Sequence, residues 1–131
     1  MADENVGDGW YALIADDDDD FRLLAARALR RAGFQVCEAR DGDELVERFS
    51  ALRVLTSQHV VVVSDISMPG RDGVTATAVL RHAAPELPIL LVTGESSPTV
   101  WRAAETAGAT LVLAKPVDGI TLVERVRTLC H

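Results

Sequence analysis

The chain has 131 residues, of which 48% are hydrophobic and 25% are charged, and its formal net charge is −7 at pH 7. This length and composition are typical of one soluble globular domain. The negative charge disfavours nucleic acid as a direct partner, because binding to nucleic-acid phosphates depends on cationic side chains. No apolar stretch approaches the ~20 residues of a membrane span, so no membrane association is expected.

Residues 1–9 are polar and contain glycine, which predicts a flexible N-terminal tail before a folded domain over residues 10–131. Hydrophobic periodicity in that domain predicts five strands that alternate with five helices. In chain order these are a strand at Tyr11–Ala15, a helix at Phe21–Ala32, a strand at Phe34–Ala39, a helix over Leu45–Leu52 capped by Asp43, a strand at Val60–Ser64, a helix at Gly73–His82, a strand at Leu87–Val92, a helix at Pro98–Ala107, a strand at Leu111–Ala114 and a helix at Ile120–Leu129. Gly33 and Gly108 are placed to end the helices that precede them.

The composition of the strands predicts how these elements are arranged. The central strands, such as Val60–Val63, are runs of apolar residues without polar alternation. Strands of this kind are buried on both faces, as in a parallel sheet between two layers of helices. The segment Phe34–Ala39 does alternate, which is typical of a strand near the edge of a sheet. The sequence therefore predicts a three-layer α/β domain, with a parallel sheet between two layers of helices.

Four of the predicted strands are followed directly by a polar or charged residue. These residues are Asp16 and Asp17 after the first strand, Asp65 after the third, Thr93 after the fourth and Lys115 after the fifth. The carboxyl ends of parallel strands lie along one edge of the sheet, where open α/β folds place their sites. We therefore expect these side chains to share one site.

Carboxylates from neighbouring strands would share a pocket, since adjacent strands lie ~4.8 Å apart. Like charges this close raise one another's pKa unless a cation lies between them. Mg²⁺ is a hard cation that prefers oxygen ligands, and we expect Asp16, Asp17 and Asp65 to bind it. The remaining acids, Asp18–Asp20, complement the dipole at the start of the next helix. The alternative for the aspartate run is a solvated acidic loop.

With a metal nearby, Asp65 has the chemistry of a nucleophile that forms an aspartyl-phosphate. Phosphoryl transfer needs positioning of the group and neutralisation of its oxygens more than covalent help. Mg²⁺ would supply one counter-charge and Lys115 a second, while the hydroxyl of Thr93 can donate to another oxygen. The alternative for Lys115 is a surface lysine, but its place directly after a strand favours a role in the site.

Four segments of the chain resemble the receiver domain of two-component response regulators. They are Leu13–Asp17, Asp65–Gly73, Val92–Gly94 and Ala114–Pro116. The resemblance extends over essentially all of residues 11–130. It implies the doubly wound, flavodoxin-like fold of chemotaxis receivers, with five parallel strands in the order 2-1-3-4-5.

The resemblance also implies a function, namely a phosphorylation-dependent signalling switch of a two-component phosphorelay. A histidine kinase or phosphotransfer protein would donate the phosphoryl group in the presence of Mg²⁺. The implied roles are phosphoacceptor for Asp65, metal binding for Asp16, Asp17, Asp65 and the backbone carbonyl of Ser67, switch hydroxyl for Thr93 and phosphate pairing for Lys115. Phe21 matches the family's first apolar helix position, which fixes the register of the aspartate run.

Two features depart from the family pattern. The family usually has Tyr or Phe three residues before the lysine, as the aromatic half of the switch, and this chain has Val112 there. The segment Arg53–His59 is longer than is typical.

Trp101 lies on the fourth predicted helix, next to the expected output face, where it either contacts a partner or anchors the helix to the sheet. Ser67 and Glu95 fall at positions that tune the lifetime of the phosphate in the family.

The sequence ends after its last predicted helix, so we expect output through contact with a downstream protein or through phosphate relay, unless the chain is part of a longer regulator or hybrid kinase.

Cys37 and Cys130 show neither metal-ligand spacing nor a disulfide framework, which predicts unpaired thiols in a reducing cytoplasm. The histidines His59, His82 and His131 are scattered, and we expect none of them to bind metal or carry phosphate.

Two other classes of protein are alternatives at this point. A phosphatase of the haloacid dehalogenase type also uses an aspartyl-phosphate with Mg²⁺, but its general acid would fall at Ser67, where it needs an aspartate. An interaction module that is not phosphorylated is favoured by Val112 and disfavoured by the intact acids and Lys115. On the leading interpretation the chain is not an enzyme for a separate substrate, and it catalyses only its own phosphorylation and dephosphorylation.

Overall fold

The computed structural model of the chain describes residues 9–55, 59–68, 70–95 and 97–130. The predicted tail, residues 1–9, lies outside these ranges apart from Gly9. Within the part of the chain that is described, no helix is long and apolar enough to cross a membrane.

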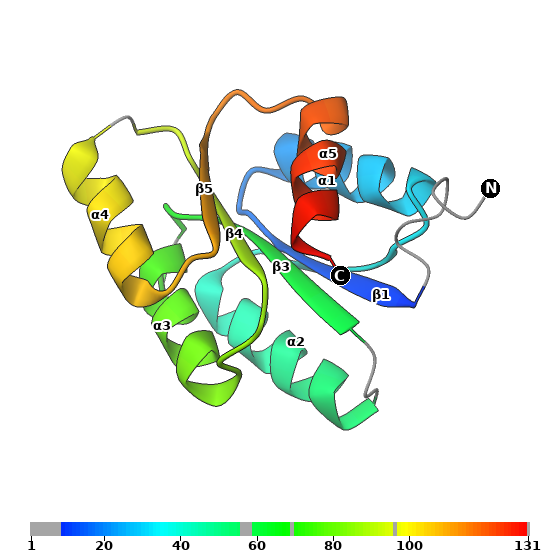
Figure 1. The fold of residues 1–131 in the computed structure, drawn as a ribbon, viewed down its shortest axis with the longest axis horizontal. Helices are drawn as coiled ribbons and strands as arrows, with labels where there is room; N and C mark the ends of the chain where they lie inside the picture. Colours follow the sequence, from blue (N-terminus) through cyan, green and yellow to red (C-terminus); the bar gives the residue numbers. More distant parts are fainter. Residues whose placement is uncertain (1–8, 56–58, 69, 96, 131) are drawn as a thin grey trace.

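Five strands and five helices alternate along the chain, as the periodicity predicted (Figure 1). In chain order they are β1 (Trp10–Ala15), α1 (Asp19–Arg31), β2 (Gln35–Ala39), α2 (Gly42–Leu55), β3 (His59–Asp65), α3 (Gly73–Ala83), β4 (Ile89–Thr93), α4 (Pro98–Ala107), β5 (Leu111–Ala114) and α5 (Gly119–Leu129). The strands form one parallel sheet in the order β2-β1-β3-β4-β5. Helices α1 and α5 cover one face of this sheet, and α2, α3 and α4 cover the other. The predicted doubly wound, three-layer fold is therefore confirmed.

The covering of both faces explains the apolar runs in the strands. On β1, Leu13 packs in the core beneath α2, α3 and α4, whereas Ile14 packs in the core beneath α1 and α5. On β3, Val62 faces the first of these cores, and its neighbours Val61 and Val63 face the second. All of these side chains are buried. Because successive residues of a strand point to opposite faces, a strand between two helix layers needs an apolar residue at every position.

Most element boundaries lie within two residues of the predicted ones, and α2 extends three residues further at each end. The strand β1 begins earlier than predicted, at Trp10, and β4 begins later, at Ile89. The segment Arg53–His59, which is longer than is typical of the family, belongs in part to two elements. Residues 53–55 form the end of α2, and His59 is the first residue of β3. Residues 56–58 lie outside the described ranges. Helix α4 and strand β5 occupy the predicted ranges.

The start of α2 corrects one prediction. The helix begins at Gly42, and the carboxylate of Asp41 accepts a hydrogen bond from the N–H of Glu44 at 2.8 Å. Asp41, and not Asp43, is therefore the residue that caps α2. Asp43 lies in the first turn instead, where its carboxylate pairs with the guanidinium of Arg71 at 3.3 Å.

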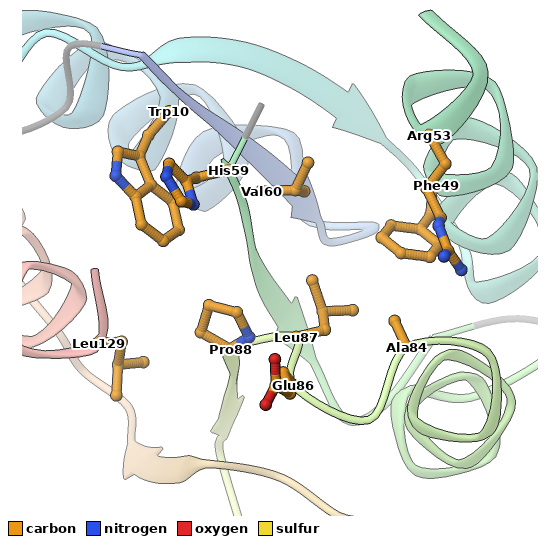
Figure 2. Close-up of a pocket in the computed structure, with 10 residues that line it drawn as sticks. All are labelled: Trp10, Phe49, Arg53, His59, Val60, Ala84, Glu86, Leu87, Pro88 and Leu129. Atoms are coloured by element: carbon orange, nitrogen blue, oxygen red, sulfur yellow. The ribbon is translucent and has the colours of Figure 1, made fainter. Parts of the chain in front are cut away.

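The amino ends of the strands form an aromatic hollow of about 390 Å³ (Figure 2). Trp10 at the start of β1 stacks on His59 at the start of β3, with ring centroids 4.5 Å apart. Across the hollow, the guanidinium of Arg53 lies 5.6 Å from the ring centroid of Phe49. Open α/β folds place their sites at the carboxyl ends of the strands, so this hollow lies at the opposite edge from the predicted site.

Arg81 ties the end of α3 to the end of α4. Its guanidinium donates to the carbonyl of Gly108 at 2.7 and 3.0 Å, and to the carbonyls of Ala84 at 3.2 Å and Pro85 at 2.8 Å. Gly108 ends α4 with a φ of 109°, and a Cβ there would lie 2.8 Å from the Arg81 side chain. The contact between Arg81 and Gly108, which we call the Arg81 clasp, therefore fixes the C-terminal end of α4.

We expect Arg81→Ala to lower the free energy of unfolding by about 1–3 kcal/mol, because it leaves part-buried carbonyls without a donor. Urea unfolding measures this change. Arg102, an exposed residue of α4, provides the matched control. Arg102→Ala should change the free energy of unfolding by less than about 0.5 kcal/mol. Equal stability of the two variants would contradict a structural role for the clasp.

Candidate functional site

The register of the sheet brings the predicted strand-end acids together. Ala15 pairs with Ser64 across β1 and β3, so Asp16 and Asp65 leave adjacent strands at the same edge. Carboxylate oxygens of Asp16, Asp17 and Asp65 all lie within 4.8 Å of one another. These three acids, which we call the acidic cluster, occupy the carboxyl edge of the sheet.

Asp16 is fully buried in this cluster. One of its carboxylate oxygens accepts a hydrogen bond from the N–H of Asp18 at 2.9 Å, and the other accepts from the ammonium of Lys115 at 3.1 Å. Arg22 on α1 donates to the backbone carbonyl of Asp16 at 2.8 Å. These contacts hold the carboxylate of Asp16 in one orientation. Asp17, in contrast, is exposed to solvent.

Asp65 ends β3 and is 8% exposed, and its carboxylate lies 3.6 Å from the ammonium of Lys115. The pKa of Asp65 is raised to about 6, mainly by burial and also by the negative charge of Asp16, whereas the charge of Lys115 acts to lower it. The carboxyl group is therefore mostly ionised at neutral pH, which is the form that can act as a nucleophile.

Lys115 joins the two buried acids. Its N–H donates to the carbonyl of Thr93 at 2.7 Å, which places its side chain at the end of β5. Burial acts to lower the pKa of Lys115, but the hydrogen bond to Asp16 and the charges of Asp65 and Asp16 outweigh burial and raise that pKa. The ammonium also lies 4.7 Å from the ring centroid of Phe21, a cation–π contact. Lys115 is therefore held as a charged group between the acids.

Thr93 ends β4 and is 2% exposed. Its hydroxyl accepts a hydrogen bond from the N–H of Glu95 at 3.0 Å and donates to the carbonyl of Glu95 at 3.3 Å. The hydroxyl therefore engages the loop between β4 and α4. Ser67 has an exposed side chain. A hydrogen bond from its backbone N–H acts to lower the pKa of Asp65, and the effect of burial in the opposite direction is larger.

Val112, at the position of the family's switch aromatic, is 6% exposed and packs in the core beneath α2, α3 and α4. Trp101 on α4 is half-buried against the same core. The buried part of Trp101 supports the interpretation that it anchors α4 to the sheet. Its remaining surface stays available on that helix.

Two side chains that support the site were not identified from the sequence as parts of it. Arg22 binds the carboxylates of Asp19 and Glu38 as well as the Asp16 carbonyl, and its side chain is 11% exposed. In the sequence, Phe21 indicated only the register of the aspartate run. In the structure, its ring makes the cation–π contact with the ammonium of Lys115. Helical spacing placed both residues on the first turns of α1, but spacing alone does not show which distant strand end a helix face meets.

The acidic cluster has the donor set that suits Mg²⁺. Its three carboxylates approach one another, and the Lys115 ammonium contacts two of them, so the cluster keeps a negative charge. Carboxylate oxygens are preferred ligands of this hard cation, which also retains water molecules where a site is open. The exposed position of Asp17 leaves one side of the cluster open to water. The residues present therefore fit the metal that the family resemblance implied.

The parallel sheet with an acidic cluster and a lysine at its carboxyl edge defines a receiver domain of two-component signalling. The sequence pattern of the response regulator receiver domain matches residues 12–127. The chain belongs to this family, which confirms the resemblance seen in the sequence. The haloacid dehalogenase alternative has no support from the family match.

Individual relatives agree with this assignment. The transcriptional regulatory protein PrrA of Mycobacterium tuberculosis is 37% identical over 118 residues, which is 89% of this chain and 48% of PrrA. The chain thus spans half or less of the length of the curated relatives it matches, with shares as low as 16%.

Solved structures show the same fold. The chemotaxis response regulator CheY4 of Vibrio cholerae is similar with a TM-score of 0.81 and 27% identity, over 93% of this chain and 98% of CheY4. A response regulator of Burkholderia pseudomallei, solved with a phosphorylated aspartic acid, a calcium ion and citrate, has a TM-score of 0.71 and 28% identity. That similarity covers 92% of this chain and 66% of the Burkholderia chain.

The raised pKa of Asp65 predicts a pH-dependent stability in metal-free solution. A carboxyl group whose pKa rises from 3.8 to about 6 on folding binds its proton more tightly in the folded state. The free energy of unfolding should therefore fall as pH rises from about 4 to about 6. Asp65→Asn should remove this dependence and exceed the wild type in stability by about 1–3 kcal/mol above that window.

Urea unfolding of both proteins from acidic to neutral pH measures the difference. Mg²⁺ should reduce it at neutral pH, because a bound cation offsets the repulsion between the carboxylates. Parallel pH curves for the wild type and Asp65→Asn would contradict this account of the Asp65 environment.

Proposed function

We propose that the domain is a phosphorylation-dependent signalling switch that accepts a phosphoryl group on Asp65 from a histidine kinase or phosphotransfer protein. The contact of the Lys115 ammonium with both Asp16 and Asp65 is the observation that carries this proposal. A cation held between two carboxylates is a ready counter-charge for a phosphoryl group on one of them. The phosphorylated aspartic acid of the Burkholderia relative supports the same chemistry.

The transfer is a displacement at phosphorus. A carboxylate oxygen of Asp65 attacks the phosphorus, and an O–P bond forms while the bond from phosphorus to the donor breaks. The leaving group takes the electron pair of the broken bond: a phosphohistidine leaves as imidazole, which takes a proton, and acetyl phosphate leaves as acetate. Water later hydrolyses the acyl phosphate, which releases inorganic phosphate and restores the carboxylate of Asp65. The domain thus catalyses changes to itself and is not an enzyme for a separate substrate.

Mg²⁺ would be held by Asp16, Asp17 and Asp65, with the backbone carbonyl of Ser67 as the further ligand implied by the family. When bound, Mg²⁺ would neutralise charge on the phosphoryl oxygens. The hydrogen bonds that Asp16 accepts from Asp18 and Lys115 orient its carboxylate toward this role. The Burkholderia relative was solved with a calcium ion, which supports binding of a divalent cation by a domain of this kind.

Thr93 would transmit the effect of phosphorylation from Asp65 to α4. Its hydroxyl now bonds to the backbone of Glu95, and a phosphoryl group on Asp65 offers a charged and therefore stronger acceptor. Movement of the hydroxyl toward that acceptor would release the loop before α4 and bias a pre-existing equilibrium of this helix. The output face formed by α4, β5 and α5, which includes Trp101, would then contact a downstream protein.

The phosphodonor protein would dock on the exposed surface of α1 and α5, the two helices that begin just after the acidic cluster and Lys115. Large apolar residues are exposed there, with Leu23 46%, Leu24 43% and Ile120 77% accessible. Arg31 lines two hollows of about 570 Å³ each on the same surface, and Arg27 lines one of them. An amphipathic helix of the phosphodonor protein, with apolar and acidic residues, would fit this combination of exposed apolar side chains and arginines.

We place this exchange in the cytoplasm. The free thiols of Cys37 and Cys130 support a reducing compartment.

Incubation with acetyl phosphate followed by intact-mass measurement tests the proposed function. The wild type should gain one phosphoryl group in the presence of Mg²⁺ and much less in its absence, and Asp65→Asn should gain none. Lys115→Ala should fold and be phosphorylated at least about tenfold more slowly, because it lacks the counter-charge. A folded wild type that gains no phosphate would reject the proposal and favour an interaction module that works without phosphorylation.

Ile120→Glu tests the docking surface. With a histidine phosphotransfer protein that phosphorylates the wild type, this variant should be phosphorylated about tenfold more slowly, since it places a charge in an apolar contact. Its rate with acetyl phosphate should not change. Val54→Glu is the matched control, because Val54 is 86% exposed on α2, and it should leave both rates unchanged. Equal slowing of Ile120→Glu with both donors would place its effect in the site and not in docking.

A further inference from the structure

We infer that Gly42, the first residue of α2, is a positioning residue for Asp65, because it allows the segment after the phosphoacceptor to pack against α2. The inference rests on the function proposed above. Gly42 is buried, and it is not among the positive-φ glycines of the described chain. Its backbone conformation therefore does not require glycine, and the reason for glycine is the space that a side chain would fill.

Gly42 lies directly against the backbone of Arg71. A Cβ on Gly42 would lie 1.9 Å from the carbonyl oxygen of Arg71 and 2.7 Å from its carbonyl carbon. Carbon–oxygen contacts are ordinarily about 3.3 Å or longer, so an alanine would force these groups apart by more than about 1 Å.

The start of α2 cannot easily yield to such a clash. The Asp41 carboxylate accepts from the N–H of Glu44 at 2.8 Å, and the Glu44 carboxylate accepts from the N–H of Arg40 at 2.8 Å. These two bonds satisfy backbone donors at the helix start and fix its position. The displacement would therefore fall on the Arg71 side of the contact.

A second glycine contact passes this displacement to the phosphoacceptor. Arg71 leads through Asp72 to Gly73, the first residue of α3. A Cβ on Gly73 would lie 2.2 Å from the carbonyl oxygen of Asp65, and the N–H of Gly73 donates to the carbonyl of Ile66 at 2.8 Å. The backbone of Asp65 thus rests on Gly73, and the segment that precedes Gly73 rests on Gly42.

An ion pair ties the same segments together from the outside. Asp43 in the first turn of α2 lies 3.3 Å from the guanidinium of Arg71, with both side chains partly exposed. An exposed pair of this kind is a weak tie compared with the backbone contact. Gly42 should therefore matter more than Asp43 for the position of Asp65.

Misplacement of Asp65 would act on its reaction. The carboxylate must meet an incoming phosphorus while it stays 3.6 Å from the Lys115 ammonium and within the acidic cluster. An error of about 1 Å in such a group can cost about 100-fold in rate. Gly42 would in this way set the phosphorylation rate without touching the phosphoryl group.

The test compares Gly42→Ala with the wild type by phosphorylation with acetyl phosphate and Mg²⁺, and by the backbone amide NMR spectrum without phosphodonor. We expect the phosphorylation rate to fall about 10- to 100-fold in a cooperatively folded variant. The amide resonances of Asp65, Ile66 and Gly73 should shift, which a general loss of stability would not produce.

Gly119→Ala is the matched control. Gly119 is also the first residue of a helix behind a capping aspartate, Asp118, and a Cβ there would lie 3.1 Å from the Cβ of Ala28. This variant makes the same change in helix propensity, and it should keep the phosphorylation rate within about twofold of the wild type.

The possible failures are distinguishable. A wild type that is not phosphorylated counts against the proposed function, whereas a phosphorylated wild type with Gly42→Ala at an equal rate overturns the positioning role. If Gly42→Ala does not fold in buffer, it is compared with the wild type in a stabilising osmolyte such as TMAO, which favours the folded state of both proteins. A lowered phosphorylation rate of the folded variant supports the inference, and a variant that still does not fold assigns Gly42 to folding alone and overturns the positioning role.

Discussion

The site depends on one electrostatic arrangement, in which the Lys115 ammonium lies between the buried carboxylates of Asp16 and Asp65. Two desolvated like charges at neighbouring strand ends repel one another, and the pKa of Asp65 is raised to about 6, first by burial and then by Asp16. The ammonium offsets part of this cost but not all of it, since the pKa of Asp65 stays raised. Asp17 adds a third carboxylate to the cluster. The cluster therefore has a deficit of positive charge, which favours a divalent cation before another anionic group can enter.

The parallel sheet explains how such groups meet although they are far apart in sequence. Asp16 and Asp65 come from the adjacent strands β1 and β3, so short side chains are enough to bring their carboxylates together. Lys115 follows β5, which is not adjacent to β1, and it lies 99 residues from Asp16 in sequence. Only a long side chain can make that contact, and the Phe21 ring supports its charged end. The residue types at the strand ends thus follow from the strand order.

Strand ends could be predicted from the sequence because apolar runs stop at chemically distinct residues, and this was enough to predict the fold and to place the acids and Lys115 at one edge. The cap of α2 could not be predicted in the same way. Asp41 and Asp43 flank Gly42 and have equal local propensity to cap a helix. In the structure Asp41 accepts from the N–H of Glu44, whereas Asp43 pairs with Arg71, which comes from another loop. Contacts between loops leave no periodic signal, and for the same reason the role of Gly42 becomes visible only in the structure.

The absence of an aromatic residue on β5 bears on how phosphorylation would reach the output face. Val112 is buried and small, so it cannot swing between two positions as a larger side chain could. The two ends of α4 differ in how firmly they are held. Its C-terminal end is fixed by the Arg81 clasp, whereas its N-cap residue, Ser97, makes no side-chain capping bond. The loop before this weaker end is the one that the Thr93 hydroxyl engages. If Thr93 moves on phosphorylation as proposed, α4 would pivot about the clasp and carry Trp101 with it, so the moving element would be the start of α4 and not a side chain of β5.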